Sequence, residues 1–214
     1  MKSSCSTIAS VIIAGSTALA SEAGIAHTYS GPGGAIADAP SNTVPAFTIY
    51  SMEVTDTFTV DQLAGVTVHG LSHAWAGDVS ITLWHDGLEV SLVHRLGWTG
   101  GSFFGDSSNF LGDYTFSDSA TGDLWTAADG GGPGYDIPGG DYFATGLDGA
   151  LVSVADAFHG HSAAGTWTLM VGDWGPTQTG AIDGFSFTVT AVPAPGGMAL
   201  LALAAGCARS RRRH

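Results

Sequence analysis

The sequence predicts an all-β protein, an antiparallel β-sandwich, from three observations. Glycine makes up 32 of the 214 residues, about twice its usual share of ~7%. Strand-favouring Thr, Val and aromatic residues are plentiful, whereas helix-favouring Lys, Glu and Gln are few. Several short runs alternate apolar and polar side chains with the two-residue period of a strand, and no run of ordinary helical length shows a helical period.

The alternating runs define the expected strands in chain order. Residues 66–68 alternate first, and 79–84 alternate before Asp86-Gly87 and a further apolar run over 88–94. An Asp-Gly pair between two such runs is typical of a hairpin turn. Residues 167–171 and 185–189 alternate later. Each run has one apolar face, which predicts sheets that cover a shared core.

The segment 97–149 differs from the alternating runs. It is rich in Gly, Asp and Ser, with scattered aromatic residues. This composition predicts long loops with a few short strands.

Residues 1–20 have the features of a helical secretory signal peptide. Lys2 precedes a mildly apolar run over 8–20, and Ala18-Leu19-Ala20 fits an A-x-A cleavage site. We expect cleavage before Ser21, which leaves a body over 21–191. Cysteine occurs only at 5 and 207, outside this body, so an exported body must rely on its core or on a metal for stability.

The last segment, 192–214, has three parts. It begins with Val192-Pro193-Ala194-Pro195 and continues with a short apolar stretch over 196–208. Four arginines make up the basic end: Arg209, Arg211, Arg212 and Arg213. The apolar stretch is shorter than the ~20 residues of a comfortable membrane helix, and the basic end would stay cytoplasmic.

This tail resembles the PEP-CTERM sorting signals of exported bacterial proteins, with Ala194 in place of the usual Glu. The resemblance implies a short helical anchor that holds the chain transiently in the membrane, and a sorting enzyme of exosortase type as partner. A plain tail anchor and a short helix packed on the body are the alternatives.

The distribution of charge excludes two classes of partner. Lys and Arg number 6 against 19 Asp and Glu, which gives −13, and Arg95 is the one basic residue between 21 and 191. All 19 acids fall in that range, so the body carries 1 − 19 = −18. Such a body repels nucleic acid and anionic membrane surfaces, and divalent cations are its natural counter-ions.

Three aspartates are candidate calcium ligands: Asp78, Asp118 and Asp173. Each begins or ends a strand-like run, and such positions can converge at one end of a sandwich. Clustered carboxylates without Lys or Arg need a cation, and calcium takes 6–8 oxygen ligands. The alternative role for each aspartate is the capping of a turn.

Three tryptophans are candidates for stacking on sugars: Trp84, Trp98 and Trp125. Trp84 has the opposite parity to Ile81 and Leu83, which predicts an exposed ring, whereas Trp167 shares the apolar parity of its run and is expected in the core. Packing of tryptophan within a sandwich core is the alternative.

Two further patterns are candidates for catalysis or metal binding. Gly105-Asp106-Ser107 resembles the surroundings of hydrolase nucleophiles, although Gly, Asp and Ser are also ordinary loop residues. His159-Gly160-His161 can place two imidazoles on one side of an extended segment, but the body has no cysteine to complete a zinc site. His73 is expected to pack and hydrogen-bond beside Trp75.

Several motifs in register resemble the P domain (P/Homo B domain) that follows the protease domain of subtilisin-like proprotein convertases. The strongest is His73-Ala74-Trp75-Ala76-Gly77-Asp78-Val79, which resembles H-x-[WY]-x-G-D-L. Residues 80–92, 109–120, 165–173 and 180–187 resemble later motifs, with Phe185 in place of Trp.

The resemblance implies a jelly-roll-like sandwich in a family with calcium-binding members. It also implies association with serine endopeptidases, but the sandwich fills the body and leaves no room for a protease domain. We therefore expect an exported, non-catalytic interaction or structural module of a bacterial cell envelope, cell surface or extracellular matrix. Its expected partners are extracellular polysaccharide or envelope proteins. A lectin-like carbohydrate-binding module and a small secreted hydrolase that uses Ser107 are the alternatives.

Overall fold

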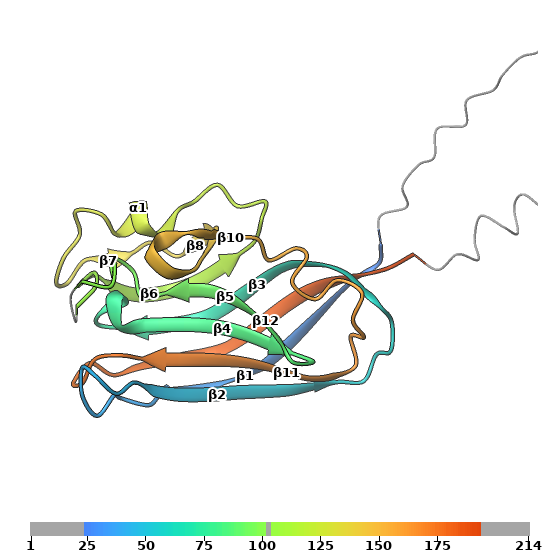
Figure 1. Ribbon diagram of the computed structural model, residues 1–214, viewed down its shortest axis with the longest axis horizontal. Helices are drawn as coiled ribbons and strands as arrows, with labels where there is room; N and C mark the ends of the chain where they lie inside the picture. Colours follow the sequence, from blue (N-terminus) through green and yellow to red (C-terminus); the bar gives the residue numbers. More distant parts are fainter. Residues whose placement is uncertain (1–23, 102–103, 194–214) are drawn as a thin grey trace, which may run out of the picture.

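A computed structural model describes residues 24–101 and 104–193, and it confirms the all-β sandwich (Figure 1). The predicted signal peptide lies outside the described residues, as does the tail from Ala194 onward. The elements in chain order are β1 (Ala26–Ile36), β2 (Ala46–Val54), β3 (Val60–His73), η1 (Ala76–Asp78), β4 (Val79–His85), β5 (Leu88–His94), β6 (Asn109–Phe116), α1 (Leu124–Ala128), β7 (Asp136–Ile137), β8 (Gly140–Tyr142), β9 (Ala144–Thr145), η2 (Leu147–Gly149), β10 (Leu151–Val152), β11 (Gly165–Asp173) and β12 (Gly180–Ala191).

Two main sheets form the layers. One sheet has the order β1-β12-β3-β6-β7, with β8 also paired to β6, and the other has the order β2-β11-β4-β5. The main pairings are antiparallel, whereas the short strands β7 and β8 pair with β6 in parallel. Strands β9 and β10 form a small separate pair.

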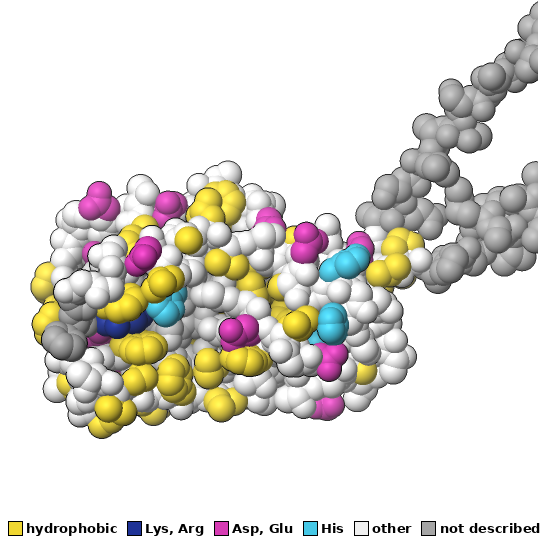
Figure 2. Space-filling model, in the orientation of Figure 1, with side chains coloured by type: hydrophobic (Ala, Val, Ile, Leu, Met, Phe, Trp, Pro, Cys, Tyr) yellow, Lys and Arg dark blue, Asp and Glu magenta, His cyan; other side chains and the backbone are white. Residues whose placement is uncertain are grey.

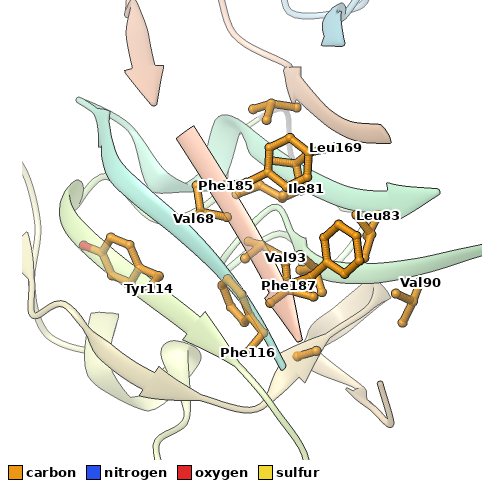
Figure 3. Close-up of a cluster of buried hydrophobic side chains, with 14 of the residues drawn as sticks. Val68, Ile81, Leu83, Val90, Val93, Tyr114, Phe116, Leu169, Phe185 and Phe187 are labelled. Atoms are coloured by element: carbon orange, nitrogen blue, oxygen red, sulfur yellow. The ribbon is translucent and has the colours of Figure 1, made fainter. Parts of the chain in front are cut away.

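The core lies between the two main sheets, as the alternating runs predicted (Figure 3). Trp167 of β11 is completely buried and stacks on Phe187 of β12 with ring centroids 4.3 Å apart. Ile81 and Leu83 of β4 are buried on the same inner side. Burial of one such large apolar side chain contributes ~1.5–3 kcal/mol, so the many buried side chains of this core contribute strongly to the fold's stability.

The predicted hairpin turn joins β4 to β5. Asp86 has φ 50° and Gly87 has φ 77°, so both turn residues lie in the left-handed region. A two-residue turn with two positive φ angles matches the right-handed twist of the strands, and Asp-Gly tolerates it well. The turn thereby sets the register in which His85 pairs with Leu88.

The segment 97–149 contains mostly loops and short strands, as expected, and one longer strand that the composition concealed. Strand β6 pairs along β3 and buries Phe110, Tyr114 and Phe116. The one-turn helix α1 begins after Asp123, whose Oδ1 accepts a hydrogen bond from the backbone N–H of Trp125 at 2.8 Å. Among the described residues, no helix is long and apolar enough to cross a membrane.

Both ends of the body leave the sandwich at the same end (Figure 1). Ala26 near the start of the body pairs with Thr190 near its end, whereas Ile36 pairs with Gly180 at the other end of the same two strands. The ten residue steps from Gly180 to Thr190 span roughly 33 Å at ~3.3 Å per residue. We call the end of the sandwich at Gly180 the distal end.

Candidate functional site

Loops and strand ends from both sheets meet at the distal end. Strand β3 finishes there, because His73 pairs with Gly180. Strand β11 finishes there too, where Asp173 pairs with Val79 at the start of β4. The sequence therefore brings its 73–79 motif and the residues after β11 together through strand pairing.

Four buried ionisable side chains from these elements form what we call the ionic cluster: His73, Asp78, Arg95 and Asp173. His73 Nε2 lies 3.3 Å from Asp173 Oδ2, and both side chains are completely buried. Arg95 Nη2 lies 4.0 Å from Asp78 Oδ1, and Arg95 Nε donates to the carbonyl oxygen of Gly77 at 3.1 Å. Each carboxylate of the cluster thus faces a basic side chain. The expectation that His73 packs and hydrogen-bonds is met.

The cluster changes the acidity of Asp78. Burial raises the pKa of Asp78 from 3.8 to about 6, repulsion by Asp173 adds to the rise, and attraction to Arg95 and His73 offsets part of it. Burial likewise lowers the pKa of the Arg95 guanidinium, while Asp78 acts in the opposite direction. Burial and Asp173 therefore favour the protonated form of Asp78 over a wider pH range than for an exposed aspartate.

Glycines allow the chain to close around the cluster. Gly175 donates its backbone N–H to Asp173 Oδ1 at 3.1 Å, and a Cβ at this position would collide with the Asp78 carboxylate. A Cβ at Gly77 would collide with the backbone of Gly105. At both positions a larger residue would have to displace backbone or buried charge, so the packing requires glycine.

Arg95 lies between two tryptophan rings at the edge of the cluster. Its Cζ atom is 4.7 Å from the ring centroid of Trp98 and 5.1 Å from that of Trp174. Trp174 Nε1 also donates to Ser80 Oγ at 3.0 Å. Cation–π contact of this kind stabilises a buried guanidinium, so Trp98 has an internal partner in this structure.

A cleft of about 270 Å³ opens beside the ionic cluster, and we call it the distal cleft. It is lined by Asn42, Trp75, Asp78, Phe104, Pro176, Thr177 and Gln178. The rings of Trp75 and Phe104 are 6.2 Å apart at their centroids and tilted by 55°. The loop with Thr177 is tied down by Asp38, which accepts the backbone N–H of Thr177 at 2.9 Å.

Two buried polar atoms of the distal cleft residues have no hydrogen-bond partner. They are Trp75 Nε1, a donor, and Asp78 Oδ1, an acceptor. The Asp78 side chain is 5% exposed, and its distance of 4.0 Å from Arg95 exceeds hydrogen-bond length. An unpaired buried polar group is unfavourable, and the indole N–H groups of Trp84 and Trp125 elsewhere in the fold are also unpaired.

The structure brings two of the three predicted calcium ligands together and leaves the third elsewhere. Asp78 and Asp173 both contact Gly175 at the distal end. Asp118 follows Phe116, which pairs with Val66 far along β3 from His73. There Asp118 caps a loop by accepting from Ser153 Oγ at 2.5 Å and from the backbone N–H of Val154 at 2.7 Å. Burial raises the pKa of Asp118, but these hydrogen bonds together lower it further than burial raises it.

Two carboxylates supply at most four of the ~6–8 oxygens that calcium takes. In the described ranges, no three His, Cys, Asp or Glu side chains form a group that could hold a metal ion. Asp78 and Asp173 already face Arg95 and His73. Calcium binding therefore stays a prediction. Of the three aspartates, Asp78 and Asp173 are the two that lie together as candidate ligands.

The other predicted stacking residues are half-buried. Trp84, which was expected to be exposed, lies on the outer side of β4 between Thr168 and Glu89 of the neighbouring strands. Trp125 of α1 lines a second hollow of about 310 Å³, which we call the α1 hollow, and its ring packs against Gly149. Both indole N–H groups are buried without a hydrogen-bond partner.

The Gly105-Asp106-Ser107 triplet lies beside the ionic cluster, where the backbone N–H of Gly77 donates to the carbonyl oxygen of Asp106 at 2.8 Å. Within the described residues, no side-chain hydrogen bond joins Ser107 to a histidine. His159 Nδ1 bonds the carbonyl oxygen of Asp61 at 2.7 Å, and His161 Nδ1 bonds Asp86 Oδ2 at 2.9 Å. The two imidazoles thus have separate partners.

The start of the sorting motif lies at the edge of the described chain. Val192 donates its backbone N–H to the carbonyl oxygen of Thr59 at 2.9 Å, and Pro193 is the last described residue. Ala194, Pro195 and the four arginines of the basic end lie outside the described residues.

Sequence reasoning missed most of the distal cleft. Asn42, Phe104 and Gln178 come from three loops that carry no shared motif. Trp75 lies inside the 73–79 motif, so that motif was a usable signal, but the tryptophan could equally have been a core residue. Loop neighbours of this kind become visible only when the strand order is known.

No protein-family model and no curated protein matches this sequence. A chain in the crystal structure of the Aeromonas sobria serine protease in complex with the chaperone ORF2 is similar to it at 16% identity and TM-score 0.41, over 79% of this chain and 28% of that chain. The crystal structure of the serine protease of Aeromonas sobria is similar at 14% identity and TM-score 0.39, over 78% and 27%. This chain spans less than a third of the length of those chains, and similarity at this level assigns no function.

Proposed function

We propose that the chain is an exported, surface-sorted, non-catalytic β-sandwich of P-domain type that acts as an interaction or structural module of a bacterial cell envelope or extracellular matrix. One observation carries the proposal. Both ends of the body leave at one end of the sandwich, and the distal cleft lies at the other. A tail that holds the domain by its C-terminal end therefore presents the cleft outward.

The side-chain environments support a non-catalytic role. The four residues of the ionic cluster are buried, and each of its two carboxylates faces a basic side chain. Nucleophilic catalysis by Ser107 would need a base within hydrogen-bond reach, and its hydrogen bonds in the described chain include no histidine. The motif resemblance over 73–79 and the later segments supports a P-domain-type body.

The test is cell fractionation of the full chain against a chain that ends at Ala191. The full chain should reach the envelope or surface fraction, and mass spectrometry of that fraction should find body peptides but none beyond Pro195. The shortened chain should be released into the medium, since it lacks the anchor. Replacement of Arg209, Arg211, Arg212 and Arg213 by Gln should impair processing without affecting export.

Two results would overturn this proposal. One is retention of both chains in the cytoplasm. The other is recovery of intact Arg211-Arg212-Arg213 on mature surface protein, which would replace sorting by a permanent tail anchor.

A carbohydrate-binding module is the second candidate function, and one observation favours it. The distal cleft combines two aromatic rings with amide, hydroxyl and carboxylate side chains. Small-molecule sites usually combine aromatic walls with a small number of well-placed polar groups.

A further inference from the structure

The distal cleft has the mixed chemistry of a ligand site. Its walls include the rings of Trp75 and Phe104, and Phe104 is 55% exposed at the rim. Its polar side chains are those of Asn42, Thr177 and Gln178. This set offers flat apolar surface together with groups that both donate and accept hydrogen bonds.

The polar side chains of the cleft indicate what a ligand must supply. Asn42 and Gln178 each offer an amide donor and an amide acceptor, and Thr177 offers a hydroxyl. A hydroxyl group can pair with any of these side chains, because it donates one hydrogen bond and accepts two. A ligand with several hydroxyls can therefore bond to more than one of them at once.

The charge around the distal cleft limits the class of ligand that it can bind. The body carries −18, so an anionic ligand such as a uronate or a phosphate is repelled. A cationic group beside Asp78 would lie close to the Arg95 guanidinium, which is already 4.0 Å from Asp78 Oδ1. A neutral ligand is repelled neither by the negative body nor by the Arg95 guanidinium.

The volume of the distal cleft limits the class of ligand further. The volume of about 270 Å³ lies just below the ~300–1,000 Å³ typical of small-molecule pockets. Such a cleft admits one or two rings rather than a long buried chain. A neutral sugar unit fits all three constraints, since it has apolar C–H faces for the aromatic walls and hydroxyls for the polar groups.

We propose that the distal cleft binds a neutral saccharide, with Trp75 and Phe104 against the sugar ring and Asn42, Thr177 and Gln178 bonded to its hydroxyls. This inference deepens the proposed function, because it names the ligand that an outward-facing cleft would engage at the cell surface. Binding by the isolated protein does not depend on sorting, so each proposal can fail without the other.

The test is saturation-transfer NMR on the full chain, in mild detergent and calcium-free buffer, which detects binding of small probes. The probes are the methyl glycosides of glucose, galactose, mannose and N-acetylglucosamine, with glucuronate as an anionic control and choline as a cationic control. At least one neutral glycoside should receive saturation, and glucuronate and choline should not. Phe104→Ala should weaken the binding of that glycoside about tenfold through loss of one aromatic wall.

Matched variants locate the site. Ile25 is 73% exposed at the opposite end of the sandwich, so Ile25→Ala removes an exposed apolar side chain far from the cleft and should leave binding unchanged. Gln178→Ala should weaken binding, whereas Gln62→Ala on β3 should not. Absence of transfer to every neutral glycoside would overturn the inference, as would choline alone giving a signal. Loss of binding in Trp125→Ala but not in Phe104→Ala would place the site in the α1 hollow and would also overturn it.

Discussion

His73 and Asp173 join the two sheets through a completely buried contact of 3.3 Å between His73 Nε2 and Asp173 Oδ2. His73 ends β3 of one sheet, and Asp173 ends β11 of the other. His73 Nδ1 also lies 3.1 Å from the carbonyl oxygen of Trp75, which connects this contact to the cleft wall. The contact therefore fixes both the spacing of the layers and the position of the 73–79 motif.

Loss of this contact should destabilise the domain strongly. His73→Ala leaves Asp173 as a buried carboxylate beside Asp78, and breaking such a buried pair typically costs about 3–5 kcal/mol. Urea unfolding should show this loss in the free energy of unfolding. His161→Ala removes an exposed partner of Asp86 and should cost about 1 kcal/mol or less. Similar losses in the two variants would contradict a clamping role for His73.

The raised pKa of Asp78 predicts a specific pH dependence of stability. Because the pKa is about 6 in the folded protein and 3.8 ordinarily, the folded state binds the proton more tightly between these values. The contribution of Asp78 to the free energy of unfolding is therefore fully present below about pH 4. This contribution is lost as pH rises through 6, by up to about 3 kcal/mol.

Asp78→Asn removes that titration while it keeps the side-chain shape. Unfolding free energies of the unmutated protein, minus those of the variant, should fall between pH 4.5 and pH 7.5. Subtraction cancels the general charge repulsion of the acidic body, which both proteins share. A difference that stays constant over this range would show that Asp78 does not titrate near pH 6 in the folded state.

The calcium prediction is now restricted to the distal end. Millimolar calcium should raise the melting temperature more than magnesium at matched ionic strength, since a calcium-sized site discriminates against the smaller ion. A specific site stabilises by about 2.7 kcal/mol at a hundredfold excess of ligand over Kd. Asp78→Asn and Asp173→Asn should each abolish most of the difference between the ions.

Asp118→Asn and Asp129→Asn are the controls for this prediction, because Asp118 caps the 153–155 loop and Asp129 is exposed beyond α1. Equal shifts from calcium and magnesium would mean that charge screening of the negative body, and not a specific site, accounts for the stabilisation.

The strands and the core could be predicted from the sequence because strand periodicity is local. Ile81 and Leu83, like Phe185 and Phe187, alternate with polar neighbours, and all four are buried. The Asp86-Gly87 turn is also a local signal, since its two positive φ angles depend on the residues of the turn itself. The strand β6 escaped prediction because the glycine-rich composition around it outweighed the alternation of Phe110, Tyr114 and Phe116.

The candidate site depended on strand order, which is not local. The position of an aspartate at the end of a strand says that it lies at an end of the sandwich, but the direction of the strand decides which end. Asp78 and Asp173 therefore meet, whereas Asp118 lies beyond the far end of β6. Likewise, the parity that pointed Trp84 outward did not determine how much of its ring the neighbouring strands cover.

The sequence by itself determined the acidic charge of the body, the alternating strands and the motif that carries His73 and Asp78. Only the tertiary structure placed Arg95 between two tryptophan rings and assembled the distal cleft from separate loops. The physical reason is that backbone propensity and burial parity act over a few residues, whereas a cleft is made where loops distant in the chain converge after the sheets have paired.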